Sequence, residues 1–292
     1  MSDSITSTIQ LSDITLSYTE WPGRQGPLIC LPGLSGHKGM FINIARSLAP
    51  TYHLFALDLR GRGDSDKPAQ GYGFAYHSRD ILRFAEAVGV DSFAIMGHSF
   101  GATLGVYLAS IRPAKVRALV LIDGGADPKE EVLEAMRPAL RRLDQTYASI
   151  ETYLEAMRNI PFYRPWNNTL EQYLRQEVEL LPGGAVRPKA SVAALDHDLD
   201  MHFYTSMCLH FPAVQCPVLF IRPRQGLLGE RGHIFTEPEA AAVVAWMPHC
   251  RRVDLPDVNH YTMILQDDPP VIPPSRVFLD EMLGGKETTE SQ

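Results

Sequence analysis

Residues 93–101 read Phe93-Ala-Ile-Met-Gly-His-Ser-Phe-Gly101, an apolar run followed by a serine between two glycines. The apolar run predicts a buried strand, and the small and apolar residues that follow, through Ile111, predict a helix. A residue at such a turn has a strained backbone, and a Cβ two positions to either side would collide with the neighbouring strand or helix. The turn therefore raises the hydroxyl of Ser99 above the sheet at a helix N-terminus, whose dipole favours developing negative charge.

Strands and helices alternate on both sides of this turn. Besides the run at 93–96, short apolar runs predict buried strands at 27–31, 53–57, 116–122, 217–222 and 250–255. Residues 6–20 alternate between apolar and polar, which is typical of an antiparallel pair of strands. Helical patterns lie between the runs, at 40–48, 76–90, 238–247 and 275–283. This alternation predicts a mostly parallel α/β sheet with helices on both faces.

The alternation breaks between Pro128 and Pro212. This stretch reads as helices separated by polar and aromatic turns, and it contains no convincing strand. We therefore expect a core domain formed by residues 1–127 and 213–292, and a helical cap, residues 128–212, inserted into it.

Composition narrows the class of protein. With 45% hydrophobic and 21% charged residues, the chain of 292 residues is typical of a globular protein. Its net charge of −7 argues against nucleic acid as a partner. The chain shows neither a signal-peptide pattern nor an apolar run of about 18 residues, so we expect a cytoplasmic protein without a membrane partner. Four scattered cysteines indicate reduced thiols. No cluster has metal-ligand spacing, so we expect neither metal nor organic cofactor.

The order of the elements and three motifs together resemble the α/β-hydrolase family. The motifs are Leu31-Pro-Gly-Leu-Ser-Gly36, Asp58-Leu-Arg-Gly-Arg-Gly-Asp-Ser65 and Gly97-His-Ser-Phe-Gly101. The resemblance extends from about residue 12 to residue 284 and is weak in the cap. It implies an eight-stranded, mostly parallel sheet with the active site at the carboxyl ends of the strands.

The resemblance also implies partners for the serine. His260 directly follows the final predicted strand, where this family places the histidine that serves as general base. The oxyanion of the reaction intermediate needs two N–H donors, and the backbone amides of Leu34 and Phe100 occupy the family's positions for them. Pro32 stands where many relatives have a histidine.

The acid of the triad is in an unusual place. Many relatives carry it after the seventh strand, but residues 221–231 contain no aspartate and only a late glutamate, Glu230. Asp123 instead ends the sixth strand, and some family members take their acid from there. We favour Asp123 as the acid that orients His260, with Asp127 and Glu230 as alternatives.

A serine nucleophile, a base and an oxyanion hole specify acyl transfer to water. We expect hydrolysis of a small-molecule carboxylic ester, lactone or amide. Two related activities remain as alternatives, carbon–carbon bond hydrolysis and cofactor-free ring-cleaving dioxygenation, and a non-catalytic ligand-binding protein is an alternative of another class. Trp166 in the cap is a candidate substrate-binding residue, as are Arg222 and Arg224, because arginine suits a carboxylate. A homodimer is compatible with the sequence.

Overall fold

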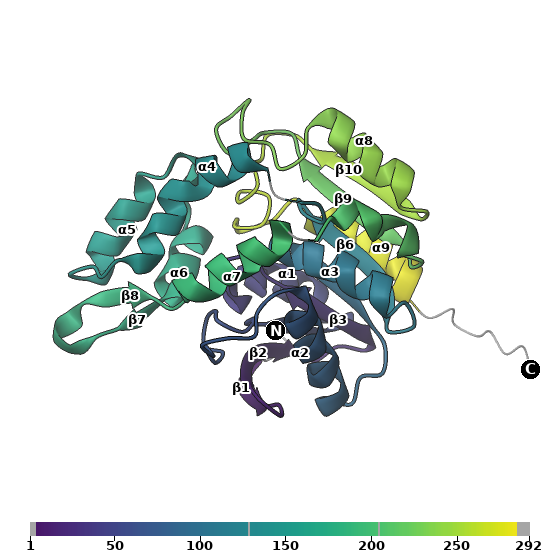
Figure 1. The fold of residues 1–292 in the computed structure, drawn as a ribbon, viewed down its shortest axis with the longest axis horizontal. Coiled ribbons are helices and arrows are strands. Elements are labelled where there is room, and N and C mark those ends of the chain that lie inside the picture. Colours follow the sequence, from purple (N-terminus) through teal and green to yellow (C-terminus); the bar gives the residue numbers. More distant parts are fainter. Residues whose placement is uncertain (1–3, 128, 204, 285–292) are drawn as a thin grey trace, which may run out of the picture.

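The central sheet has eight strands in the order β1-β2-β4-β3-β5-β6-β9-β10 (Figure 1). The computed structural model describes residues 4–127, 129–203 and 205–284. β1 pairs with β2, and β2 with β4, in antiparallel fashion, and every other pairing in the sheet is parallel. The strands are β1 (Ile5–Gln10), β2 (Thr15–Trp21), β3 (Gln25–Leu31), β4 (Tyr52–Leu57), β5 (Phe93–His98), β6 (Val116–Ile122), β9 (Val218–Pro223) and β10 (Cys250–Leu255).

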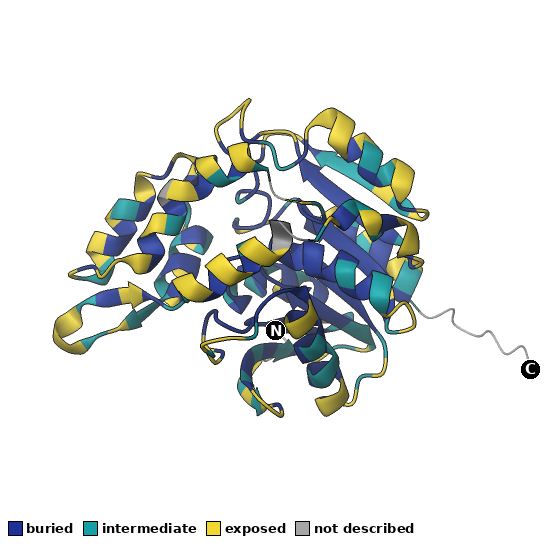
Figure 2. Ribbon diagram, viewed as in Figure 1, coloured by how far each residue is buried: buried dark blue, intermediate teal, exposed yellow. Residues whose placement is uncertain are grey.

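Helices cover both faces of this sheet. Residues of α1 (Ile42–Leu48) and α9 (Ile272–Leu283) belong to the apolar core on one face. Those of α2 (Phe74–Ala87), α3 (Phe100–Ile111) and α8 (Glu237–Trp246) belong to the core on the other face. Along β3 the side chains alternate between the two cores, and β5 and β9 are buried over their whole length (Figure 2). Burial on both faces explains why these strands read as continuous apolar runs.

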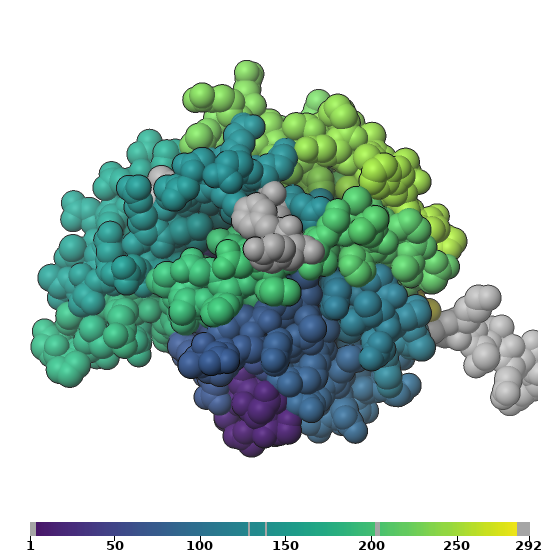
Figure 3. All heavy atoms as spheres, in the orientation of Figure 1, coloured from purple at the N-terminus to yellow at the C-terminus, as the bar shows by residue number. Residues whose placement is uncertain are grey.

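The segment between β6 and β9 forms the cap (Figure 1). Its helices are α4 (Glu130–Leu140), α5 (Ile150–Arg158), α6 (Asn168–Glu177) and α7 (Val192–Phe203). The expectation that this stretch contains no strand is wrong, because β7 (Val178–Leu180) and β8 (Val186–Pro188) form an antiparallel hairpin. Three residues per strand are too few to show an alternating pattern. In Figure 3 the teal and green atoms of the cap lie directly against the core.

Short 3₁₀ helices complete the fold, and most of them lie in the cap. They are η1 (Lys38–Phe41), η2 (Arg141–Asp144), η3 (Pro161–Tyr163), η4 (Pro182–Gly184), η5 (Met207–Leu209) and η6 (Phe211–Ala213). Across the described ranges, no helix is both long and apolar enough to cross a membrane.

Candidate active site

Ser99 lies at the sharp turn between β5 and α3. Its backbone has φ 55° and ψ −118°, a conformation that residues other than glycine rarely adopt. A Cβ on Gly97 would lie 2.4 Å from the backbone nitrogen of Ala102, and one on Gly101 would lie 2.1 Å from the carbonyl oxygen of Leu31. Close packing of backbone against backbone therefore requires both glycines, and it leaves the half-buried Ser99 raised at the carboxyl end of the strand.

His260 and Asp123 meet beside this turn. His260 Nδ1 lies 2.7 Å from Asp123 Oδ2, and each side chain is only 2% exposed. Because the carboxylate accepts, Nδ1 carries the proton and Nε2 is left as the basic nitrogen. Asp123 directly follows β6 and has a φ of 44°, so a strained turn fixes the acid as another fixes the serine. Ser99 and His260 line the same pocket.

Burial tunes the charge states of this pair. It lowers the pKa of His260, which keeps the ring neutral at neutral pH and leaves Nε2 unprotonated, although it also makes the ring a weaker base. It also raises the pKa of Asp123, because a low-dielectric site disfavours the carboxylate. A buried, oriented and neutral imidazole is what general-base catalysis requires.

His260 is held in place with the help of two residues that were not predicted from the sequence, His98 and Asn259. His98 Nε2 donates to the carbonyl oxygen of His260 at 2.9 Å, and the two rings lie 4.3 Å apart between centroids. Asn259 Nδ2 donates to the carbonyl oxygen of Phe162 in the cap at 3.1 Å. The contact of His98 could have been predicted, because this histidine lies in the motif at 97–101 next to Ser99. The contact with Phe162 could not, because no sequence pattern links it to Asn259.

The two predicted oxyanion-hole residues, Leu34 and Phe100, both line a pocket with Ser99. The carbonyl oxygen of Leu34 accepts a hydrogen bond from Arg62 Nε at 2.8 Å. Arg62 is fully buried and forms an ion pair of 2.6 Å with Asp198 of α7. Arg62 thus ties the loop that carries Leu34 to the cap.

The structure separates the three candidate acids. Asp127 accepts from the backbone nitrogen of Met207 at 2.9 Å, and Glu230 is exposed in the turn after β9. Of the three, it is Asp123 whose carboxylate is hydrogen-bonded to His260.

The proposed substrate-binding residues are not brought to Ser99. Arg222 is already paired inside the fold, with Glu237 at 2.9 Å and with the carbonyl oxygen of Phe235 at 3.0 Å. Arg224 is exposed. Trp166 donates to Glu171 at 3.1 Å, within the cap. None of the three lines either pocket that reaches Ser99, and their role in substrate binding stays a prediction.

Two pockets reach Ser99, and they differ in character. We call the first the apolar pocket: it lies under α4 and is lined by Val132, Leu133, Leu140, Leu199 and Ile234, among others. We call the second the tyrosine pocket: it is lined by Ser35, Arg142, Tyr163, Tyr173 and Tyr261, together with His98 and His260. Ser99, Leu34 and Met136 line both. Within the described ranges, no three His, Cys, Asp or Glu side chains are grouped to hold a metal ion.

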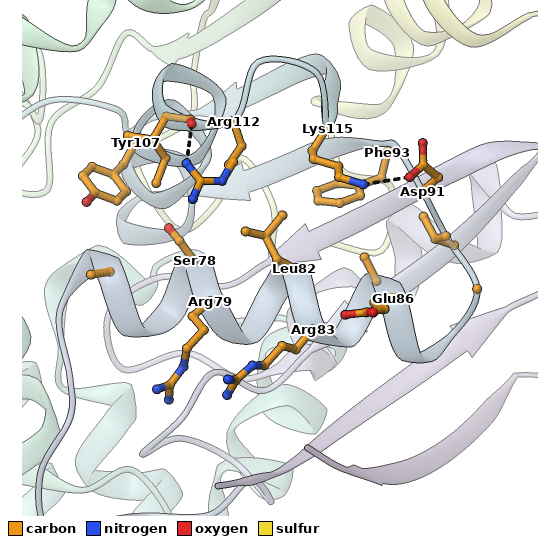
Figure 4. A pocket seen from close by; sticks show the side chains of 15 residues that line it. Ser78, Arg79, Leu82, Arg83, Glu86, Asp91, Phe93, Tyr107, Arg112 and Lys115 are labelled. Atoms are coloured by element: carbon orange, nitrogen blue, oxygen red, sulfur yellow. Dashed lines mark hydrogen bonds and ion pairs between the residues drawn. The ribbon is translucent and has the colours of Figure 1, made fainter. Parts of the chain in front are cut away.

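A larger surface hollow lies between α2 and α3 (Figure 4). Phe93, at the start of β5, lines it, whereas Ser99 follows the end of that strand. The residues lining it include no histidine, and its Lys115 is paired with Asp91 at 2.7 Å. The hollow therefore offers no histidine as a base, and Ser99, His260 and Asp123 lie at the other end of the strand.

Comparison with known proteins agrees with this architecture. A protein of Klebsiella pneumoniae strain 342, provisionally named a carbamate hydrolase, is 34% identical over 113 residues, which are 38% of this chain and 42% of that protein. The chain thus spans less than half the length of that relative. The 2-(acetamidomethylene)succinate hydrolase of Mesorhizobium japonicum is 27% identical over 88% of this chain and 89% of its own.

A solved structure of an E-2-(acetamidomethylene)succinate hydrolase has the same fold. It superposes with a TM-score of 0.80 at 22% identity, covering 96% of this chain and 99% of the other. Residues 26–267 match the family described as the alpha/beta hydrolase fold. The chain therefore belongs to the α/β-hydrolase family.

Proposed function

We propose that this protein is a serine hydrolase that transfers an acyl group from a small carboxylic ester, lactone or amide to water. The observation that carries the proposal is the 2.7 Å hydrogen bond between His260 and Asp123 beside the strained turn of Ser99. Ser99 lines one pocket together with His260 and a second pocket together with Asp123. A nucleophile, a base and an orienting acid are the groups that acyl transfer needs.

Each group has a defined task in this reaction. His260 Nε2 removes the proton of Ser99 as its oxygen attacks the carbonyl carbon of the substrate. Asp123 holds the ring in the required tautomer and stabilises the imidazolium that forms. The backbone amides of Leu34 and Phe100 donate to the oxyanion, and His260 then gives its proton to the leaving group. Water attacks the acyl-enzyme by the same steps, which releases the acid and restores Ser99.

The relatives support hydrolysis in general. Those cited are named as hydrolases, and a relative of Pseudomonas putida that is 32% identical over 116 residues is named N-formylmaleamate deformylase. No feature of this site favours carbon–carbon cleavage or dioxygenation over acyl transfer. An assembled Ser99, His260 and Asp123 argues against a purely ligand-binding role.

Turnover by Ser99→Ala tests the proposal. On p-nitrophenyl esters, lactones and aromatic amides, we expect the variant to lose about 10⁶-fold in kcat, the scale seen when a triad serine is removed. Ser110→Ala, on the helix that follows the turn, is the matched control and should retain wild-type activity. Because no step uses a metal ion, EDTA should leave wild-type activity unchanged. Undiminished turnover by Ser99→Ala would contradict the proposal.

A further inference from the structure

We propose that the tyrosine pocket binds a carboxylate of the substrate, while the apolar pocket holds an uncharged, apolar part of the same molecule. The preferred substrate would then be a small ester or amide with one anionic end and one apolar end. This inference rests on the proposed function and adds the class of substrate to it.

The polar lining of the tyrosine pocket consists mainly of hydrogen-bond donors. Tyr163, Tyr173 and Tyr261 are hydroxyl-bearing residues on three different segments, two of them in the cap and one next to His260. Burial raises the pKa of each phenol, so all three stay protonated at neutral pH. Among the described residues, none forms a hydrogen bond with these three hydroxyls, so the hydroxyls are available to a ligand.

A buried cation stands beside these hydroxyls. Arg142 lines the pocket, and its Nη2 lies 3.3 Å from Ser35 Oγ, which lines it as well. Glu177 holds the guanidinium through both of its carboxylate oxygens, with 3.1 Å between Nε and Oε2. Glu177 does not line the pocket and also accepts from Tyr153. These contacts orient the guanidinium, and of the pair it is Arg142 that lines the pocket.

The apolar pocket has the opposite electrostatic character. The acids Asp123 and Asp127 line it. Among its described lining residues the one cation is Lys129, which is paired with Glu239 at 2.8 Å, just as Arg142 is paired with Glu177. The two pockets therefore differ in the acids that line them. A substrate carboxylate placed there would face two acids. In the tyrosine pocket it would find an arginine and several O–H donors, and no Asp or Glu among the lining residues.

Desolvation makes this difference decisive. Withdrawing an anion from water is unfavourable unless several hydrogen-bond donors replace its hydration. Hydrogen bonds from charged or phenolic donors to a carboxylate are the strong class. Because Leu34, Ser99 and Met136 line both pockets, a single substrate can occupy both while its carbonyl group lies at Ser99.

Two matched pairs of esters test the inference. p-Nitrophenyl hydrogen glutarate and p-nitrophenyl pentanoate differ by a carboxylate on the acyl arm. m-Carboxyphenyl butyrate and phenyl butyrate differ by a carboxylate on the leaving group. We expect at least one charged ester to have a kcat/KM at least about tenfold above that of its neutral partner, since a hydrogen bond to a charged group has roughly that effect.

Removing one hydroxyl at a time tests which side chains bind the carboxylate of the substrate. Tyr163→Phe, Tyr173→Phe and Tyr261→Phe keep the ring and should each lower kcat/KM for the preferred charged ester by about tenfold, with the neutral ester little changed. Tyr147→Phe, a buried cap tyrosine outside both pockets, is the control and should change neither.

The outcomes separate the two proposals. If the neutral esters are hydrolysed through Ser99 as fast as the charged ones, or if each phenylalanine variant slows all esters equally, the inference is overturned and the proposed function stands. If none of the four esters is hydrolysed in a Ser99-dependent way, the proposed function fails and the inference fails with it.

Discussion

The carboxyl edge of the sheet and the cap contribute to one site by different means. At the sheet edge the backbone does the positioning: Ser99 and Asp123 both have positive φ values in turns that directly follow strands. In the cap, side chains do it: Arg142 is held by Glu177, and Asp198 reaches across to Arg62. Under the proposals above, the chemistry takes place at the edge, and the cap contributes most to the choice of substrate.

This difference predicts that damage at the edge lowers turnover of every substrate, whereas damage in the cap changes stability or the ranking of substrates. The largest effect should come from Asp123→Asn, because asparagine can present an N–H to the ring and favour the wrong tautomer. We expect kcat to fall by about 10⁴, the loss seen for the corresponding change in a protease triad, with the melting temperature little changed.

Glu230→Gln is the control for this change and should be nearly silent, since Glu230 is exposed and His260 is bound to Asp123. The kcat values of the two purified variants on one ester show which of the two residues is the acid. If the two results were reversed, Glu230 would be the acid, and the role assigned to the end of β6 would be wrong.

A smaller effect, on stability, should follow from Asp198→Asn. It leaves the fully buried Arg62 without its counter-charge, a change that costs about 3–5 kcal/mol for a buried pair. Chemical denaturation measures the free energy of unfolding. Asp196→Asn, an exposed position on the same helix, is the matched control and should lie within about 0.5 kcal/mol of wild type. A stable Asp198→Asn protein would show that the cap does not depend on this ion pair.

The same pair predicts a pH dependence. Burial acts to raise the pKa of Asp198, but His77, Arg62 and the N–H of Gly73 together hold it well below the ordinary value of 3.8. A carboxylate with a lowered folded-state pKa stabilises the fold above its unfolded pKa, and that contribution fades as the pH falls through the folded-state pKa. The stability gap between wild type and Asp198→Asn should therefore be full above about pH 5 and narrow below about pH 4. A gap independent of pH down to about pH 2 would contradict this assignment.

The smallest effect is expected at Arg224. The side chain is exposed and outside both pockets, so Arg224→Ala should leave kcat/KM for charged and neutral esters within about twofold of wild type. A selective tenfold loss on the charged esters would place the carboxylate site there and not in the tyrosine pocket.

The two regions also differ in how much of them the sequence reveals. Buried parallel strands have a local pattern, and the glycines around Ser99 stand at fixed spacing in one strand–turn–helix motif, although Gly101 packs on Leu31 of the neighbouring β3. The proposed roles of His260 and Asp123 came from their places at strand ends in a recognised family order. The strands and the motif depend on neighbours in sequence and could be predicted from the residues, whereas the pairing of His260 with Asp123 was expected only from the family resemblance.

The cap's contribution depends on contacts between distant segments. Arg142 meets Glu177, 35 residues away, through the packing of the cap on itself, and Arg62 meets Asp198 where the cap packs on the core. Arg222 and Arg224 were predicted to bind a substrate carboxylate. No pattern in the sequence shows that Arg222 already forms ion pairs with Glu237 and Asp254. The hairpin of β7 and β8 was missed because its strands are too short to have a pattern.

Covalent labelling tests the central claim, that Ser99 is a nucleophile activated at the sheet edge, most directly. Wild-type protein treated with a fluorophosphonate should gain the mass of one phosphonyl group. Peptide mapping should place that group on Ser99, and Ser99→Ala should remain unlabelled while keeping the wild-type melting temperature. Asp123→Asn should be labelled far more slowly than Glu230→Gln. A label on another residue, or equal labelling of wild type and Ser99→Ala, would contradict the account.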